Sequence, residues 1–372
     1  MTVPPDPPPP TDVRVVLAAG VTRTAEIHGI SAAGAAPCEL ALTPAADAEV
    51  LVHGDVVRAP AVPESPTGCP TPAVVTRAAV AVLGLSVTVL DARLSSPTAA
   101  DPVTLGADPG GDVREPEPVP AAPQIRTRAR AVGAELDGHP VIAETIPGGT
   151  TTALSVLRAL GEEFGVSSSL PDNPVERKRR VAREALSASG LSQGGCTGDP
   201  DRALRRAGDP VLAAVVGVVE GVLADRDETA APAVTLGGGT QMLAATALLR
   251  HAGVTAPLRV ATTSYVARDP TADVRDAARA LDVDLVATDP GFGAHPAVSR
   301  YAAGEGKEGV GMGGVLWLAD RAGRLPAVRE RARSLADALG VGPTEDCPSE
   351  RSLEKDDKMD TAGEKDVRTD DG

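Results

Sequence analysis

The stretch VIAETIPGGTTT, residues 141–152, joins an apolar segment to a helix start through a glycine turn. Residues 141–143 are apolar and are followed by turn residues, which is typical of a strand buried inside a sheet. The Pro-Gly-Gly sequence ends that strand, and the threonines after it favour a helix from Thr150. The same order recurs where residues 233–236 form an apolar segment and a helix is expected from Thr240. This alternation predicts an α/β fold.

Short apolar segments elsewhere extend the same pattern. Parallel strands that are covered on both faces form continuous apolar runs, as these do. We therefore expect an α/β fold with a doubly wound, mostly parallel, Rossmann-like sheet and helices on both faces. Ligands of such folds bind beyond the carboxyl ends of the strands. The further predicted strands are residues 13–17, 50–52, 87–89, 258–261 and 285–287.

Proline, glycine and charge content divide the chain into segments. Residues 1–12 are rich in proline, and residues 342–372 are charged with few apolar side chains, so both are expected to be disordered. Residues 98–123 are rich in Pro, Gly and Asp, which predicts a loop or linker. This linker separates an N-terminal α/β part, residues 13–97, from a larger Rossmann-like core, residues 124–341.

The composition favours an acidic globular protein. The 372 residues are 42% hydrophobic but only 1% aromatic, so the core must be built from Ala, Val and Leu. A formal charge of −15 argues against nucleic acid and anionic membranes as partners, because both attract basic surfaces. Lysine is confined to Lys178, Lys307 and the acidic tail, a pattern that favours a salt-rich cytoplasm. A GC-rich genome is the alternative explanation.

Cysteine spacing and hydropathy predict a cytoplasmic protein. The cysteines lie far apart, without the spacing of metal ligands, which predicts reduced thiols and no metal or other cofactor. No apolar run approaches the roughly 20 residues that span a bilayer, and the N-terminus lacks the features of a signal peptide. The cysteines are Cys38, Cys69, Cys196 and Cys347.

The Pro-Gly-Gly turn is the first candidate binding site. Gly148 and Gly149 let backbone N–H groups approach an anion, and the helix start adds a positive dipole end and the hydroxyls of Thr150 and Thr151. Glu144 places a carboxylate beside them. These features suit a phosphate site, but this segment alone favours a plain strand-to-helix turn capped by threonine. No lysine follows the glycines, so the turn is not a Walker loop.

A second glycine turn, Gly237-Gly238-Gly239-Thr240, follows the next predicted strand. Two such turns in one parallel sheet converge on one ligand more readily than either turn does alone. A dinucleotide site is the competing interpretation, but neither turn has the GxGxxG spacing. The pair therefore favours a phosphate-bearing ligand.

A glycine-rich loop at residues 304–314 carries two carboxylates, Glu305 and Glu308, together with Lys307. Its glycines allow backbone conformations that aim a carboxylate into a cleft, where it acts as a general base. Taken alone, the loop is better explained as a solvated surface segment. His295 is expected near a helix start, and no two histidines lie within a helical turn of each other, so no catalytic triad or metal site is predicted.

Taken together, these segments resemble the nicotinate-nucleotide:dimethylbenzimidazole phosphoribosyltransferases, and more closely the archaeal branch of that family. The resemblance covers nearly everything between the two terminal segments, and it makes residues 124–341 the phosphoribosyltransferase core. TPAADA at residues 43–48 is among its archaeal features. Its main signatures are PGGTTTAL at residues 147–154, SSSLPDNPVERKR at 167–179, GGGTQM at 237–242 and KEGVGMGG at 307–314.

The resemblance implies roles for particular residues. The bacterial segment similar to residues 144–151 helps to hold the nucleotide, although Gly149 stands where the bacterial motif has asparagine. Glu308 matches the glutamate that acts as general base, and Glu305, which also stands between glycines, leaves the register open. The implied substrate-binding residues are Glu144, Gly148, Gly149, Thr150, Thr151, Gly237, Gly238, Gly239 and Thr240.

The activity implied by the resemblance moves the phosphoribosyl group of nicotinate mononucleotide to 5,6-dimethylbenzimidazole or a related base. The products are α-ribazole phosphate and nicotinate, for cobalamin nucleotide-loop assembly. Because nicotinate leaves through a neutral ring nitrogen, no metal is needed, and family members are homodimers. A non-catalytic nucleotide-binding or regulatory protein on the same fold is the alternative. An NAD-type dehydrogenase lacks its fingerprint here.

Overall fold

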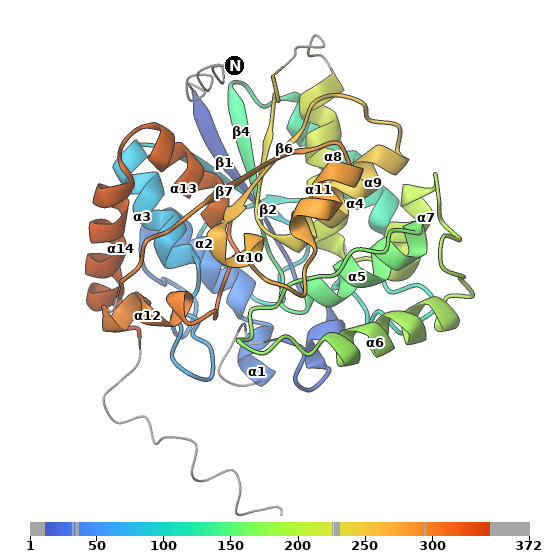
Figure 1. The fold of residues 1–372 in the computed structure, drawn as a ribbon, viewed down its shortest axis with the longest axis horizontal. Helices are drawn as coiled ribbons and strands as arrows, with labels where there is room; N and C mark the ends of the chain where they lie inside the picture. Colours follow the sequence, from blue (N-terminus) through green and yellow to red (C-terminus); the bar gives the residue numbers. More distant parts are fainter. Residues whose placement is uncertain are drawn as a thin grey trace, which may run out of the picture.

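One parallel sheet forms the centre of the protein in the computed structural model, which describes residues 12–31, 33, 37–106, 108–224, 226, 231–293 and 295–342. The strand order is β3-β2-β1-β4-β5-β6-β7 (Figure 1), and every neighbouring pair is parallel. The predicted α/β class is therefore confirmed. The strands are β1 (Val13–Ala19), β2 (Ser86–Asp91), β3 (Val103–Thr104), β4 (His139–Thr145), β5 (Thr235–Gly237), β6 (Arg259–Thr263) and β7 (Asp284–Thr288).

The direction of winding reverses between β1 and β4. The chain builds β2 and β3 on one side of β1, then returns to place β4 on the other side and continues outward to β7. Leu17 of β1 accordingly pairs with Val89 on one side and with Ala143 on the other. In doubly wound sheets such a reversal leaves a crevice beyond the carboxyl ends of the strands. Glu144 and Thr145, the last residues of β4, lie at this crevice.

Successive side chains of the central strands point to opposite faces and enter two hydrophobic cores. Val16 and Ile142 belong to the first core, whereas Leu17 and Ala143 belong to the second. Both faces are apolar because helices cover both.

The two helical layers lie on opposite sides of the sheet (Figure 1). The first core contains residues of α4 (Ala122–Ala134), α5 (Gly149–Leu160), α6 (Val175–Ala188), α7 (Pro200–Ala207), α8 (Pro210–Ala224), α9 (Thr240–His251) and α11 (Val274–Ala280). The second contains residues of α2 (Thr43–His53), α3 (Ala73–Leu83), α12 (Pro296–Ala302), α13 (Met312–Arg321) and α14 (Leu325–Leu339). The short helices are η1 (Arg23–Glu26), α1 (Pro37–Leu40) and α10 (Ser264–Ala267).

One predicted strand is wrong. Residues 50–52 belong to the last turns of helix α2, which begins at Thr43. A short apolar run fits a buried helix as well as a buried strand, so its composition does not distinguish the two. Pro44 decides the outcome, because proline is accommodated in the first turn and the helix then continues to the left-handed Gly54.

The structure describes almost none of the two terminal segments but nearly all of the predicted linker. Of the two terminal segments, 1–12 and 342–372, only Asp12 and Gly342 are described. The stretch 98–123 contains the two-residue strand β3, loops and the first two residues of α4. Strands from both the N-terminal part and the larger core belong to the one sheet.

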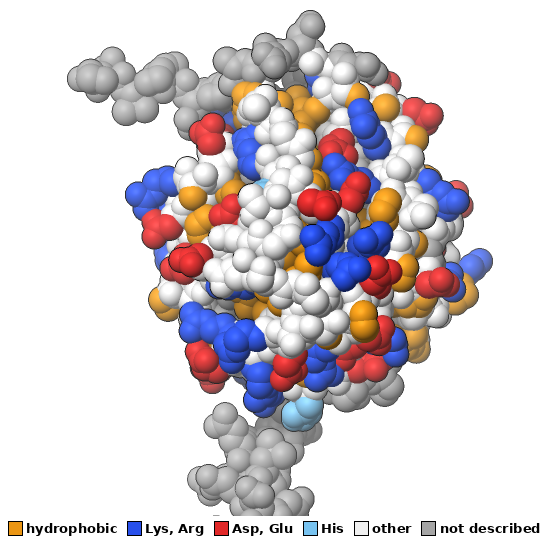
Figure 2. Space-filling view, turned by 90° about the vertical axis from the view of Figure 1, so that its right-hand side faces the viewer, with side chains coloured by type: hydrophobic (Ala, Val, Ile, Leu, Met, Phe, Trp, Pro, Cys, Tyr) orange, Lys and Arg blue, Asp and Glu red, His pale blue; other side chains and the backbone are white. Residues whose placement is uncertain are grey.

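Buried free cysteines and a surface of mixed charge are found among the described residues. Cys69 and Cys196 are buried free thiols, while Cys347 lies outside the described residues. On the face shown in Figure 2, acidic and basic side chains lie next to one another. Exposed ion pairs of this kind add about 0–1 kcal/mol each to stability. No helix among the described residues is long and apolar enough to cross a membrane.

Helices α4 and α8 approach closely where glycines face the partner's backbone. A Cβ atom added at Gly217 of α8 would lie 2.2 Å from the carbonyl oxygen of Arg126 in α4. One added at Gly133 of α4 would lie 2.2 Å from the carbonyl oxygen of Val218 in α8. Because these neighbours are backbone atoms, no side-chain rotation relieves the contact. The glycines therefore set the distance between the two helices.

We expect Gly217→Ala to lower the free energy of unfolding by roughly 1–3 kcal/mol, the usual cost of overpacking. The loss should appear although alanine favours a helix over glycine by about 1 kcal/mol. Chemical denaturation measures the change. Gly293→Ala is the control, since a Cβ there meets no atom within 4 Å. Equal stability of the two variants would contradict the packing role of Gly217.

Candidate active site

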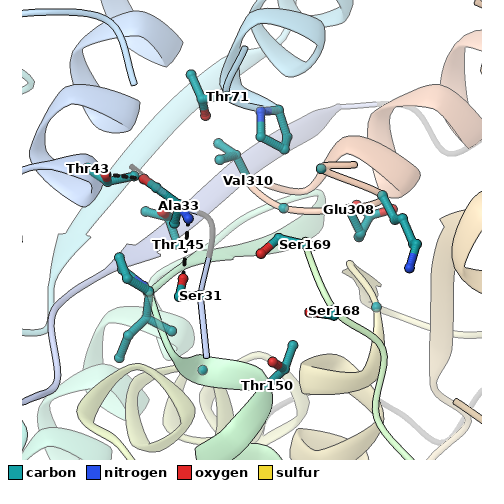
Figure 3. A pocket seen from close by; sticks show the side chains of 18 of the residues that line it. Ser31, Ala33, Thr43, Thr71, Thr145, Thr150, Ser168, Ser169, Glu308 and Val310 are labelled. Atoms are coloured by element: carbon teal, nitrogen blue, oxygen red, sulfur yellow. Dashed lines mark hydrogen bonds between the residues drawn. The ribbon is translucent and has the colours of Figure 1, made fainter. Parts of the chain in front are cut away.

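A pocket opens beyond the carboxyl ends of β4 and β5 (Figure 3). The space free of protein atoms inside the pocket and in front of its mouth, open solvent included, measures about 960 Å³. Its walls combine segments that are far apart in the sequence. The lining residues lie within segments 30–33, 43–47, 63–72, 144–150, 167–169, 239–241 and 306–310, together with Val266.

Most residues that the sequence predicts for the site line this pocket. Thr151 does not, because it is fully buried inside α5. Gly237 packs instead against α13, where a Cβ would lie 3.2 Å from Cα of Gly314. Gly238 donates its N–H to the carbonyl oxygen of Ala261 (2.9 Å) and does not line the pocket either. The predicted residues that do line it are Glu144, Gly148, Gly149, Thr150, Gly239, Thr240 and Glu308.

Two helix N-termini meet at one end of the pocket. Gly148 has a φ of 80°, which glycine adopts without strain, and α5 begins directly after it. Helix α9 begins at Thr240, whose hydroxyl accepts the N–H of Ser167 (3.2 Å). Thr150 and Ser168 place further hydroxyls here (Figure 3). Unpaired N–H groups and positive dipole ends suit a phosphate, so we call this region the anion end.

Glu308 is held at the pocket wall by backbone amides. The N–H of Thr263, the last residue of β6, donates to one carboxylate oxygen (3.1 Å). The N–H of Gly313, in the first turn of α13, donates to the other (2.8 Å). The Thr263 hydroxyl also donates to the carbonyl oxygen of Lys307 (2.5 Å). The carboxylate is thus positioned by the ends of two regular elements.

The loop that carries Glu308 contains a strained residue. Val310 has a φ of 52°, which is rare for a β-branched side chain and costs about 1–3 kcal/mol. Its N–H donates to the carbonyl oxygen of Glu144 (2.9 Å), and its side chain is buried in the second core. These contacts hold the strained conformation and join the loop to the end of β4. Strain of this kind is concentrated at functional sites.

The structure distinguishes the two carboxylates of this loop. Glu305 is buried outside the pocket, where it accepts hydrogen bonds from the hydroxyls of Ser65 (3.0 Å) and Thr67 and pairs with Arg300 (3.4 Å). Glu308 lines the pocket. Of the two, Glu308 is therefore the one placed to contact a ligand.

Carboxyl groups around the pocket have raised pKa values. Burial raises the pKa of Glu144 to about 8, and the nearby carboxylates of Asp209 and Glu308 add to the shift. Burial likewise raises the pKa of Glu308 to about 8, against the effect of its backbone hydrogen bonds. Burial raises the pKa of Asp47 to about 6, against the effect of its hydroxyl donors. Such shifted groups in a pocket are candidates for proton transfer.

The two lysines that precede the acidic tail both lie beside the pocket. Lys307 lines it and pairs with the carboxylate of Asp269 (3.0 Å). Lys178 is buried under the wall and donates to the carbonyl oxygen of Ser167 (2.7 Å), and burial lowers its pKa to about 7. Two isolated lysines in an arginine-rich chain indicate positions where arginine does not fit. The sequence analysis did not use them to locate the pocket.

Asp47 and Gln241 also line the pocket and were not predicted as site residues. The Gln241 amide follows the second glycine turn directly and donates to the carboxylate of Glu144 (2.9 Å). Asp47 lies in the TPAADA segment, but its partners Thr71 and Thr145 are 24 and 98 positions away, so the local sequence does not place it in the site. Among the described residues, no three His, Cys, Asp or Glu side chains are grouped as metal ligands.

The raised pKa values couple stability to pH. The carboxyls of Glu144 and Glu308 keep their protons to about pH 8 in the folded state, against an ordinary value of 4.5. Between those values the folded state binds more protons than the unfolded state, so the free energy of unfolding falls as pH rises. We expect Glu144→Gln to make this dependence shallower in denaturation curves between about pH 5 and 8. An unchanged dependence would contradict the raised pKa of Glu144.

The sequence is similar to archaeal proteins that bear the name UPF0284 protein. It is 53% identical over 333 residues to the protein of Halobacterium salinarum, covering 88% of this chain and 98% of the relative. It is 38% identical over 343 residues to the protein of Methanothermobacter thermautotrophicus, and the match covers 88% of this chain and 93% of the relative. It is 40% identical over 306 residues to the protein of Methanosarcina mazei, and the match covers 80% of this chain and 86% of the relative. No family model matches the chain.

The fold is similar to solved structures from Thermus thermophilus. CobT from this organism matches with a TM-score of 0.53 at 20% identity, covering 87% of this chain and 83% of that chain. A structure of its nicotinate-nucleotide-dimethylbenzimidazole phosphoribosyltransferase gives a TM-score of 0.53 at 20% identity, covering 88% and 84%. At this identity the similarity establishes a shared fold.

Proposed function

The chain belongs to the UPF0284 protein family of archaea, and we propose that it is a phosphoribosyltransferase. It would transfer the phosphoribosyl group of nicotinate mononucleotide to 5,6-dimethylbenzimidazole or a related base, for cobalamin nucleotide-loop assembly. The observation that carries the proposal is the position of Glu308 in the same pocket as the two helix N-termini of the anion end. The shared fold with the Thermus thermophilus enzymes supports the same reaction class.

In this proposal the anion end holds the phosphate of the nucleotide. The N–H groups at the starts of α5 and α9 and the hydroxyls of Thr150 and Thr240 donate hydrogen bonds to its oxygens. The ammonium of Lys307 lies beside this region, paired with Asp269 at 3.0 Å. A fixed phosphate restricts where the ribose lies, and such positioning supplies much of the rate acceleration.

The reaction needs one proton acceptor. The bond between the anomeric carbon and the pyridine nitrogen breaks, and its electron pair stays on the nitrogen of nicotinate. A nitrogen of the acceptor base forms the new bond to that carbon, and the other ring nitrogen gives its proton to Glu308. Since burial raises the pKa of Glu308 to about 8, its carboxylate is a stronger base than an ordinary glutamate, and this ionised form predominates above about pH 8. In its ionised form, which predominates above about pH 8, Glu144 stabilises positive charge that develops on the ribose.

Glu308→Gln tests this assignment. We expect nicotinate release from nicotinate mononucleotide, in concentrated KCl, only when a benzimidazole is present. The substitution should slow release by roughly 10²–10⁴-fold, because it removes the proton acceptor, while calorimetry still detects binding of the nucleotide. Glu305→Gln is the matched control from the same loop and should retain turnover, since Glu305 lies outside the pocket.

Two results would contradict the proposal. If the native protein binds the nucleotide but releases no nicotinate with any benzimidazole, a non-catalytic nucleotide-binding or regulatory role is the better conclusion. If both substitutions reduce turnover equally, the loss reflects damage to the loop and Glu308 is not the base.

We also propose a homodimer in a salt-rich cytoplasm. The homodimer follows from the resemblance to the phosphoribosyltransferases, and the salt-rich cytoplasm follows from the formal charge of −15. Light scattering in concentrated KCl measures the oligomeric state directly.

A further inference from the structure

The pocket has two ends of opposite hydrogen-bonding character (Figure 3). At the anion end, the hydroxyls of Thr150 and Ser168 and the helix N-termini present groups that can donate. At the other end, Asp47, Thr71 and Thr145 form a cluster that we call the acceptor wall. The chemistry of this wall restricts the second substrate.

The hydroxyl hydrogens of the acceptor wall are already used. Thr71 Oγ1 lies 2.6 Å from Asp47 Oδ1, and Thr145 Oγ1 lies 2.6 Å from Asp47 Oδ2. A carboxylate oxygen accepts and a hydroxyl has a single hydrogen, so both threonines donate to Asp47. They therefore offer only lone pairs to a ligand in the pocket.

Two neighbouring hydroxyls that line this end also donate their hydrogens within the protein. The Thr43 hydroxyl donates to the carbonyl oxygen of Ala33, and the Ser65 hydroxyl donates to the carboxylate of Glu305 (3.0 Å). Ser31 differs, because it accepts the N–H of Ala33 (3.3 Å) and keeps its own hydrogen. Prolines, which have no N–H, complete this part of the lining at Pro63, Pro70 and Pro72.

Asp47 has unused acceptor capacity. Among the described residues its hydrogen bonds come from the two threonine hydroxyls, and no cation pairs with it. A carboxylate has about four acceptor positions, so about two remain. The side chain is only 2% exposed, and a buried acceptor without a donor is costly. A ligand that brings a donor to this wall would therefore be favoured over one that does not.

We propose that the acceptor base presents a hydrogen-bond donor to the acceptor wall, so that the preferred substrate is an aromatic nitrogen heterocycle bearing a hydroxyl or amino group. The inference rests on the proposed function and specifies its second substrate. Asp47, Thr71 and Thr145 bind the edge of its ring, and the nearly buried side chains of Ile30 and Val310 belong to the same pocket lining.

Two methyl groups at the same edge are a poor match. They would displace water from the carboxylate of Asp47 without replacing its hydrogen bonds. Sites that bind a substrate through buried hydrogen bonds reject analogues without the donor, by up to about 10⁴–10⁵-fold. This wall opens onto a pocket, so we expect a smaller preference, about 10- to 100-fold in kcat/KM, for a hydroxyl-substituted over a dimethyl-substituted benzimidazole.

A comparison of acceptors measures this preference. The donor is nicotinate mononucleotide, and the assay is run near pH 8, where Asp47, with a pKa of about 6, is ionised. The acceptors are 5-hydroxybenzimidazole, 5-aminobenzimidazole, benzimidazole and 5,6-dimethylbenzimidazole. The native enzyme should prefer the first two, and Asp47→Asn should bring the ratio of kcat/KM values toward one. This ratio does not depend on the fraction of correctly folded enzyme.

Asp209→Asn is the matched control. Asp209 is another fully buried carboxylate that accepts a threonine hydroxyl, from Thr152, and burial raises its pKa to about 6. It does not line the pocket, so its substitution should leave the ratio unchanged. The preference of the native enzyme decides the question even if a variant fails to fold.

The possible failures are distinguishable. If 5,6-dimethylbenzimidazole is used as well as the hydroxyl-substituted base, or if Asp47→Asn leaves the ratio unchanged, the inference is overturned and the transferase activity stands. If no acceptor releases nicotinate, the proposed function fails and the inference fails with it.

Discussion

The hydrogen bond from the N–H of Val310 to the carbonyl oxygen of Glu144 is the contact on which the pocket depends. Strand β4 lies in the middle of the sheet, between β1 and β5, and its last residues, Glu144 and Thr145, are held by pairing with Ala18 and Ala19 of β1. Through this bond the glycine loop takes its position from the sheet. Gly309 and Gly311, with φ of 145° and 77°, allow the sharp path on either side of the strained Val310. The carboxylate of Glu308 is thereby brought into the pocket.

The carboxylates around the pocket are compensated by neutral donors. Backbone amides bind Glu308, threonine hydroxyls bind Asp47, and a side-chain amide binds Glu144. An arginine or lysine partner would stabilise the charged form and lower the pKa of each group. Neutral donors allow burial to dominate, which keeps these pKa values high. The pocket can therefore hold or accept protons near neutral pH.

Asp269 is the contrasting case and connects the two functional regions. It accepts the hydroxyl of Ser167 (2.7 Å) and pairs with Lys307 (3.0 Å). Burial alone would raise its pKa, but hydrogen bonds from Thr271, Ser167 and Lys307 outweigh burial and lower the pKa to about 2. The Asp269 carboxylate stays charged, and its contacts with Ser167 and Lys307 connect the loop at the anion end to the loop that carries Glu308. Lysine suits this place because its compact ammonium reaches a buried carboxylate from a short loop.

The sequence by itself determined the local units, since β4, α5, β5 and α9 and their glycine turns are encoded by residues a few positions apart. The same local signals are ambiguous at residues 50–52, because a buried helix and a buried strand are equally apolar. They also cannot tell Gly239, which lines the pocket, from Gly237, which packs on α13. Only the tertiary structure decided that Glu308 faces the pocket while Glu305 is bound elsewhere, and that Asp47 meets Thr71 and Thr145. These contacts join segments that are far apart in the sequence. Strand order and helix packing bring the segments together, and local periodicity encodes neither of them.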